Sequence, residues 1–158
     1  MQRQTKIIYF FVLIILSFFF NACKKDKNRS VIPYVSVNFS IRLDDPLFTA
    51  LNAEGNSVLV TSDYAQQYSA GYDDNGIIVY RAAIDEFYAF DATCPHDLDS
   101  ISVAVEIDGS SVATCPVCGS RYILFNHGYP TDAGPSRIAL QEYITEFDND
   151  KTITVHSW

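Results

Sequence analysis

The sequence predicts an all-β domain, built as a small antiparallel sandwich or barrel. In residues 36–43, apolar and polar residues alternate strictly, so Val37, Phe39, Ile41 and Leu43 share one face. This period of two is typical of a half-buried strand. No stretch shows a sustained helical period, and the 158 residues fit one compact domain plus a targeting segment.

Further strands are expected along the rest of the chain. They are short runs rich in β-branched and aromatic residues: 57–60, 76–81, 86–90, 101–107, 111–114, 121–125, 138–147 and 151–156. Asp108-Gly109 predicts a tight hairpin turn between two of them, and 148–150 joins the last pair. The polar segment 64–76 is expected to be a loop.

The first 22 residues are expected to be an export signal and not part of the fold. Arg3 and Lys6 precede an uncharged apolar stretch, 7–20, and the small Ala22 stands before Cys23. A positive start, a short apolar core and a small residue at the cleavage point are typical of such signals. The stretch is short for a membrane span of roughly 20 residues, and an uncleaved anchor helix is the alternative. Both interpretations place the domain outside the inner membrane.

Phe20-Asn21-Ala22-Cys23 resembles the lipobox of bacterial lipoproteins, in which the cysteine becomes the lipid-modified N-terminus. The resemblance implies a lipid on Cys23 and a protein of the bacterial cell envelope, anchored to a membrane and facing the periplasm or the cell surface. Residues 23–35 then form the lipidated cysteine and a polar, basic tether. Residues 36–158 form the domain.

The chain is acidic, with a net charge of −8 at pH 7. Removing residues 1–22 takes away Arg3 and Lys6 and no acid, so the mature charge is −8 − 2 = −10. This charge argues against nucleic acid as a partner, because binding it requires a basic face. Besides Cys23, three cysteines remain. An odd number argues against a disulfide framework in an oxidising compartment and favours a metal site.

Those three cysteines and one histidine lie in two short loops. Cys94-x-His96 is followed, after an 18-residue gap, by Cys115-x-x-Cys118. Each loop directly follows a predicted strand, and the hairpin between them brings the two loops together. Thiolates and imidazole are the ligands that zinc and iron–sulfur centres prefer. The pattern therefore predicts a metal centre with four ligands.

The same residues resemble a Rieske domain, in which a Cys-x-His loop and a Cys-x-x-His loop hold a [2Fe–2S] cluster. Residues 115–122, CPVCGSRY, are similar to the family's second loop. Gly134-Pro135-Ser136 stands where the family has its proline-containing covering loop, and 76–96 resembles the strands before the first loop. The similarity extends over 36–158 and is particularly close to Rieske lipoproteins of Bacteroidetes-type bacteria.

The resemblance implies a role for each residue of the two loops. Cys94 and Cys115 would bind one iron, and His96 and Cys118 the other, with Cys118 in place of the family's second histidine. Ser120 matches a serine whose hydroxyl bonds a bridging sulfide, and Tyr122 matches a tyrosine whose phenol bonds a ligand thiolate. A third thiolate adds one negative charge, so the reduction potential should lie below that of a two-histidine centre.

Two classes of function remain open. The first is one-electron transfer through a [2Fe–2S] cluster, with a redox protein as partner. The second is a structural or interaction module with Zn²⁺ in a Cys3His site, or with an empty site whose Cys115 and Cys118 are free or disulfide-bonded. The sequence has no Ser/His/Asp grouping and no phosphate-binding loop, so we expect an electron-transfer or binding protein rather than a stand-alone enzyme.

Overall fold

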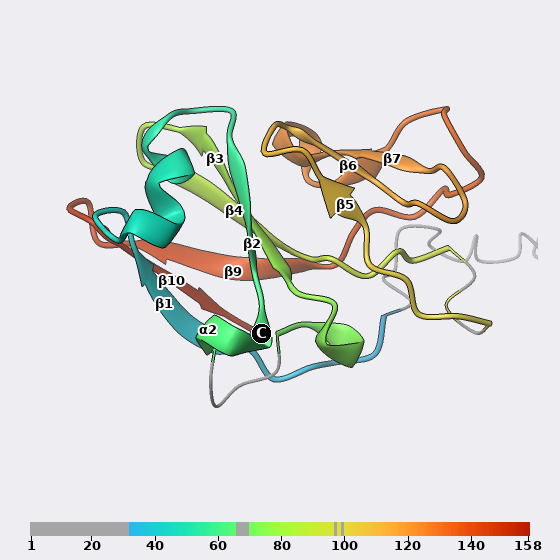
Figure 1. Cartoon of the computed structure of the whole chain (residues 1–158), viewed down its shortest axis with the longest axis horizontal. Coiled ribbons are helices and arrows are strands. Elements are labelled where there is room, and N and C mark those ends of the chain that lie inside the picture. The colour runs from blue at the N-terminus through green and yellow to red at the C-terminus, as the bar shows by residue number, and fades with distance from the viewer. Residues whose placement is uncertain (1–31, 66–69, 97, 99) are drawn as a thin grey trace, which may run out of the picture.

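The computed structural model describes residues 32–65, 70–96, 98 and 100–158, which Figure 1 draws in colour. The predicted signal segment, Cys23 and most of the tether lie outside the described residues. In the part that is described, no helix is long and apolar enough to cross a membrane.

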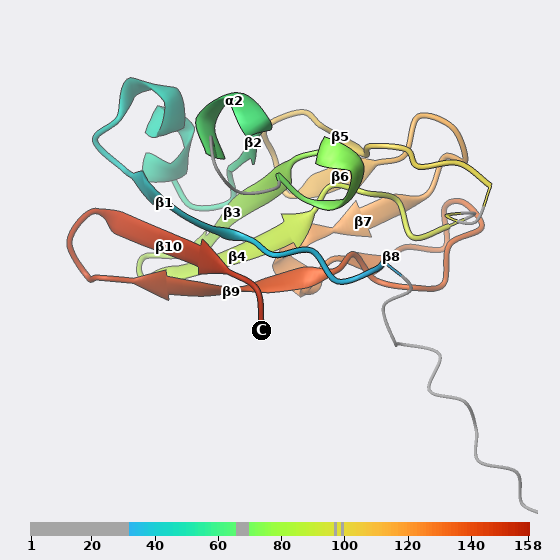
Figure 2. The same ribbon diagram turned by 90° about the horizontal axis from the view of Figure 1, so that it is seen from below.

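Two antiparallel sheets form the domain, which confirms the predicted all-β class. The larger sheet has the order β1-β10-β9-β4-β3-β2 and the smaller one β5-β6-β7-β8. The bounds are β1 (Asn38–Arg42), β2 (Ser57–Val60), β3 (Ile77–Ala83), β4 (Glu86–Asp91), β5 (Glu106–Ile107), β6 (Val112–Thr114), β7 (Arg121–Ile123), β8 (Tyr129–Pro130), β9 (Glu142–Phe147) and β10 (Thr152–His156). Figure 2 shows β9 and β10 as a hairpin with β1 alongside.

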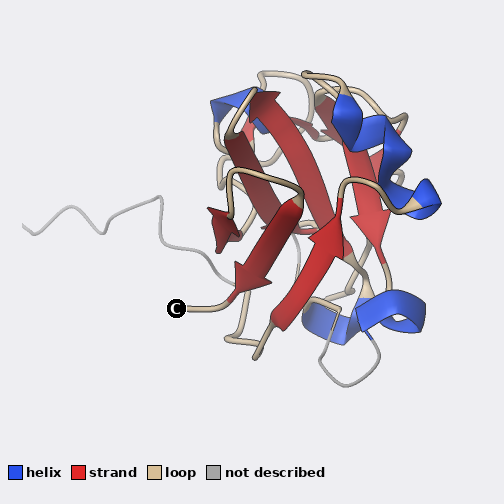
Figure 3. Cartoon of the chain, turned by 90° about the vertical axis from the view of Figure 1, so that its left-hand side faces the viewer, coloured by secondary structure: helices blue, strands red, loops and turns tan. Residues whose placement is uncertain are grey.

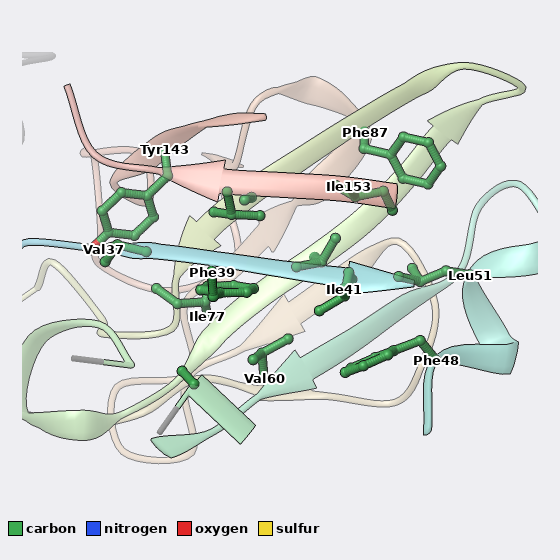
Figure 4. Packing of buried hydrophobic residues seen from close by; sticks show 14 of the residues in the cluster. Val37, Phe39, Ile41, Phe48, Leu51, Val60, Ile77, Phe87, Tyr143 and Ile153 are labelled. Atoms are coloured by element: carbon green, nitrogen blue, oxygen red, sulfur yellow. The ribbon is translucent and has the colours of Figure 1, made fainter. Parts of the chain in front are cut away.

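Strict alternation in β1 fixes which side chains are buried. Phe39 and Ile41 are buried while their neighbours Asn38, Ser40 and Arg42 are exposed. Ile41 lies opposite Ile153 of β10 in the antiparallel register. Figure 4 shows these side chains meeting others from β3, β4 and β9 in one apolar cluster. Complete burial of one such side chain stabilises the fold by about 1.5–3 kcal/mol.

The alternating side chains of β3 contribute to two different cores. Ile77 and Val79 pack in the cluster of Figure 4, whereas Ile78 and Tyr80 point to the opposite face of the sheet. There they belong to a second cluster with residues of the smaller sheet: Val105, Ala113, Tyr122 and Leu124. Cys94 and Cys115 are members of this second cluster. Cys94 and Cys115 therefore lie in the apolar layer between the two sheets, and Cys118 packs against it.

One predicted strand is wrong over most of its length. Only Glu106–Ile107 of the predicted strand 101–107 is β-strand, and Ile101 is exposed. The preceding residues pair instead with the chain around Cys94, through an isolated bridge between Thr93 and Ala104. The residues do alternate in sequence, but their backbone pairs with the loop that contains Cys94 and not with the second strand of the hairpin.

Several short helical turns were not predicted from the sequence: η1 (Pro46–Asn52), α2 (Ser62–Ala65), η2 (Tyr72–Asp74) and η3 (Leu124–Asn126). They lie around the strands, as Figure 3 shows in blue. η1 has a recognisable start, because Pro46 stands in its first turn and the Asp45 carboxylate accepts a hydrogen bond from the Leu47 N–H. These turns are too short for a periodic pattern to reveal them.

Candidate metal centre

Three thiols converge between the sheets. Cys94 follows β4, Cys115 follows β6, and Cys118 lies in the turn that leads into β7. Their three Sγ atoms all lie within 4.8 Å of one another, and those of Cys94 and Cys118 are 3.8 Å apart. Cys94 and Cys115 are buried and Cys118 is partly exposed, and all three are free thiols. The structure therefore brings together three of the four predicted ligands.

Backbone hydrogen bonds hold each loop in place. In the second loop, the Gly119 N–H donates to the Cys115 carbonyl at 3.0 Å, and the Cys115 N–H donates to the Ser120 carbonyl at 2.8 Å. Gly119 has a φ of +72°, which glycine adopts without strain. The resulting tight turn keeps Cys115 and Cys118 close together.

The first loop is clamped by the segment that was expected to be a strand. The Cys94 N–H donates to the Val103 carbonyl at 2.8 Å, and the Val105 N–H donates to the Ala92 carbonyl at 2.7 Å. Asp91 fixes the start of this loop. Its buried carboxylate accepts hydrogen bonds from the N–H of Thr93 and the hydroxyl of Tyr143. No sequence signal distinguished this buried acid from an ordinary loop acid.

Two hydroxyl groups contact the thiols. The Tyr122 hydroxyl lies 3.2 Å from Cys94 Sγ, and the Tyr122 ring is completely buried. The Ser120 hydroxyl lies 3.2 Å from Cys118 Sγ. Because Ser120 Oγ also accepts a hydrogen bond from the Ser136 N–H at 3.0 Å, its own hydrogen is available to a Cys118 thiolate. Both hydroxyls are thus placed to stabilise negative charge on sulfur.

The covering segment 133–136 packs directly on the second loop. A Cβ added at Gly134 would lie 2.5 Å from Ser120 Cα, so only glycine permits this approach. Ser136 is buried, and its N–H reaches Ser120 as described above. The segment that the sequence placed over the centre is therefore in contact with it.

Burial and hydrogen bonding act differently on the thiols. Burial raises the pKa of Cys94 to about 12, against the opposing effect of the hydrogen bond from Tyr122. For Cys118, burial also acts to raise the pKa, but hydrogen bonds with Ser120 and with the other two thiols outweigh it and lower the pKa. Burial and the hydrogen bond with Cys94 raise the pKa of Tyr122, which therefore keeps its proton. Cys118 is the thiol that ionises more easily.

The predicted histidine ligand lies apart from this group. His96 is two residues beyond Cys94 and partly buried, but it is not among the side chains whose ligand atoms lie within 4.8 Å of one another. His127, in the turn after η3, is engaged elsewhere: its Nδ1 lies 3.2 Å from the Glu142 carboxylate, and its ring is next to that of Tyr88. The fourth position therefore remains assigned by the sequence alone.

The donor set is suitable for a soft metal. Three thiols in an apolar layer, with an imidazole in the same loop as one of them, match the ligand preferences of zinc and of iron–sulfur clusters. Among the described residues this is the group of side chains that could hold a metal. The residues of the site therefore fit a zinc ion or an iron–sulfur cluster.

Comparison with known proteins gave a match only among solved structures. No family model and no curated protein matches the chain. The ferredoxin of carbazole 1,9a-dioxygenase from Nocardioides aromaticivorans IC177 is 20% identical, with a TM-score of 0.47 over 79% of this chain and 100% of its own. A chain in a complex of reduced oxygenase and oxidised ferredoxin of carbazole 1,9a-dioxygenase is 19% identical, with a TM-score of 0.44 over 82% and 96%.

A third similar structure is described as a putative NADH-dependent nitrite reductase small subunit from Mycobacterium tuberculosis. It is 15% identical, with a TM-score of 0.42 over 79% of this chain and 98% of its own. At such identities the ligand and the activity have to be argued from the side chains of the site.

Proposed function

We propose that the chain is a Rieske-like electron-transfer protein that binds a [2Fe–2S] cluster through Cys94, His96, Cys115 and Cys118. The observation that carries the proposal is the meeting of three thiols from two loops, with the Tyr122 hydroxyl on Cys94. When bound, such a cluster accepts and releases one electron.

The residues around the thiols are suited to this role. Cys94 and Cys115 are buried, which keeps water from two of the ligands. The hydroxyls of Tyr122 and Ser120 lie 3.2 Å from Cys94 Sγ and Cys118 Sγ, where each can donate to a ligand thiolate and so favour the more negative, reduced state. Cys118 is partly exposed and Val117 beside it is 66% exposed, so the second loop offers the side from which a redox protein would approach.

A zinc site is the second candidate, and one distance favours it. Cys94 and Cys118 Sγ are 3.8 Å apart. Two thiolates on one tetrahedral zinc ion, with Zn–S bonds of about 2.3 Å, are separated by about 3.8 Å. In that case the chain would be a structural or interaction module without redox activity.

Metal analysis separates the two candidates. The protein is purified anaerobically, and its iron, acid-labile sulfide and zinc are measured together with its visible absorption. We expect iron and sulfide in equal amounts and a visible chromophore that dithionite bleaches. One zinc per chain without visible absorption would contradict the electron-transfer proposal.

We further propose that residues 1–22 are removed and that Cys23 carries lipid, which would anchor the domain at the cell envelope. The support is the order of charged, apolar and small residues before Cys23. Intact mass measurement of the membrane-extracted chain tests this directly. The natural chain should carry the added mass of acyl chains, and Cys23→Ser should lack it and leave the membrane fraction.

A further inference from the structure

A groove separate from the thiols runs over β4 and β9. It has a volume of about 500 Å³, and no residue of the metal centre lines it. Its walls include the aromatic rings of Tyr88 and Trp158 and the carboxylates of Asp85, Glu86 and Glu142. None of the described lining residues is a lysine or an arginine. Aromatic faces beside carboxylates form a site for an organic cation.

The walls of the groove are held in position by contacts within the domain. The Tyr88 hydroxyl donates to the Glu86 carboxylate, and the hydrogen bond raises the pKa of Tyr88 to about 12, so the ring remains neutral. His127 contacts both the Tyr88 ring and the Glu142 carboxylate. Trp158, in contrast, is 80% exposed. A large indole with this exposure is available to a ligand.

Charge is distributed unevenly along the chain. Residues 32–158 contain 5 Lys and Arg against 18 Asp and Glu, a net charge of 5 − 18 = −13 at pH 7. The segment 24–29, KKDKNR, contains four basic residues and one acid, a net charge of 4 − 1 = +3. The largest concentration of positive charge in the mature chain thus directly precedes a strongly acidic domain.

The basic segment is connected to the domain next to the groove. The Tyr34 hydroxyl lies 3.0 Å from Ser157 Oγ, and the Ser157 N–H donates to the Val37 carbonyl at 2.9 Å. Figure 2 shows the C-terminus beside this stretch of chain. Ser157 precedes Trp158, which lines the groove. Ile32 is itself buried, so Arg29 is three residues before the first anchored residue of the domain, a reach of about 10 Å for extended chain.

We propose that the groove binds the basic segment 24–29 of the same chain, with its ammonium and guanidinium groups against Glu86 and Glu142 and over the rings of Tyr88 and Trp158. The short connection gives the segment an effective concentration in the millimolar range, so weak contacts are sufficient for substantial occupancy. These contacts are between exposed charges and are therefore weakened by salt. The proposal does not depend on what the thiols bind.

Trp158 reports on the groove, because it is the only tryptophan of the chain. Quenching of its fluorescence by acrylamide is measured on the full chain in a neutral detergent at low salt. A first variant carries Lys24→Gln, Lys25→Gln, Lys27→Gln and Arg29→Gln together, and a second carries Glu86→Gln and Glu142→Gln. Both should be quenched roughly twofold more steeply than the natural chain, because a segment at millimolar effective concentration covers the indole about half of the time. A variant that carries both sets of substitutions should be quenched no more steeply than either set alone.

Salt and a matched substitution provide the controls. In about 0.5 M NaCl, where charges are screened beyond about 4 Å, the natural chain should be quenched as steeply as the variants. Glu106→Gln, in β5 and outside the groove, should behave as the natural chain. Equal quenching of the first variant and the natural chain at low salt would overturn the proposal.

Other occupants give different results. If quenching of the natural chain changes only when vesicles of anionic lipid are added, the segment binds headgroups and the proposal is wrong. Zero-length carbodiimide cross-linking gives an independent readout, since it joins an amine to a carboxylate in contact. We expect cross-links from Lys24, Lys25 or Lys27 to Glu86 or Glu142. Cross-links only to acids outside the groove would also overturn the proposal.

Discussion

At the scale of single residues, two hydroxyl groups lie against the thiols, one from Tyr122 and one from Ser120. Many sites have a CxxC turn, but here a completely buried tyrosine directs its hydroxyl at Cys94, and the Ser120 hydroxyl reaches Cys118. The spacing of the cysteines predicted that Cys94, Cys115 and Cys118 lie together. It could not predict that the Ser120 hydroxyl is also bonded by the Ser136 N–H, because Ser136 belongs to a separate segment of the chain.

Replacing Tyr122 by phenylalanine tests the hydrogen bond to Cys94. The variant keeps the buried ring and removes the hydroxyl, so the reduced, more negative cluster loses more stabilisation than the oxidised one. We expect the midpoint potential to fall by several tens of millivolts, since a difference of about 1 kcal/mol corresponds to about 40 mV for one electron. A redox titration followed in the visible range measures it, and an unchanged potential would refute the role of the hydroxyl.

Replacing Cys118 by histidine tests the unusual ligand. One thiolate is exchanged for a neutral imidazole, so the cluster carries one negative charge less. We expect the potential to rise by about 100–300 mV, roughly half of the interval between four-cysteine ferredoxins and two-histidine centres. Electron paramagnetic resonance should report the changed ligand field. Cys118→Ala is the control, because it removes the ligand without replacing it. If this variant kept an unchanged resonance signal, Cys118 would not be a ligand.

At the scale of elements, alternation identified β1, and short runs of β-branched and aromatic residues identified the other strands of the larger sheet. Alternation failed where the pairing partner was irregular. Residues 101–105 alternate as a strand does, yet they bond to the Cys94 loop through Val103 and Val105. The local pattern does not report which backbone segment a strand pairs with, and here it also failed to report burial, because Ile101 is exposed. The same limit explains why the buried Asp91 and the two-residue strand β8 were not foreseen.

The covering segment offers a test with an internal control. Gly134→Ala places a Cβ 2.5 Å from Ser120 Cα at a φ of +89°, whereas Gly55→Ala meets no atom within 4 Å at a φ of +83°. Both variants carry the cost of a left-handed alanine, about 1–2 kcal/mol. Only Gly134→Ala must also displace the loop, so we expect it to lose at least about 1 kcal/mol more. Denaturant unfolding measures the free energy of unfolding of both variants. Equal losses of stability would show that the covering segment moves away from Ser120 without cost.

For the molecule as a whole, acid should weaken the fold. The hydrogen bond from Arg42 lowers the pKa of Asp44 to about 2, and backbone N–H donors, Thr152 foremost, lower that of Asp148. Because the folded pKa values lie below the unfolded value of about 3.9, this stabilisation is complete above pH 4 and is lost as the pH falls towards 2. Unfolding midpoints between pH 7 and pH 2.5 measure it. In Asp148→Asn, stability should fall less steeply with decreasing pH than in the natural chain. If the stability of the natural chain did not change with pH, the stabilising role of these two carboxylates would be contradicted.

The larger arrangement of the chain has a consequence for the life of the protein in the cell. Cys94 extends from the six-stranded sheet, and Cys115 and Cys118 from the four-stranded one. Whatever these thiols bind therefore fastens one sheet to the other, and a copy that lacks it keeps only the apolar contacts and the backbone hydrogen bonds between them. Such copies open more often and meet the proteases of their compartment sooner. Cofactor loading would thus determine how long each copy persists, without any dedicated sensor.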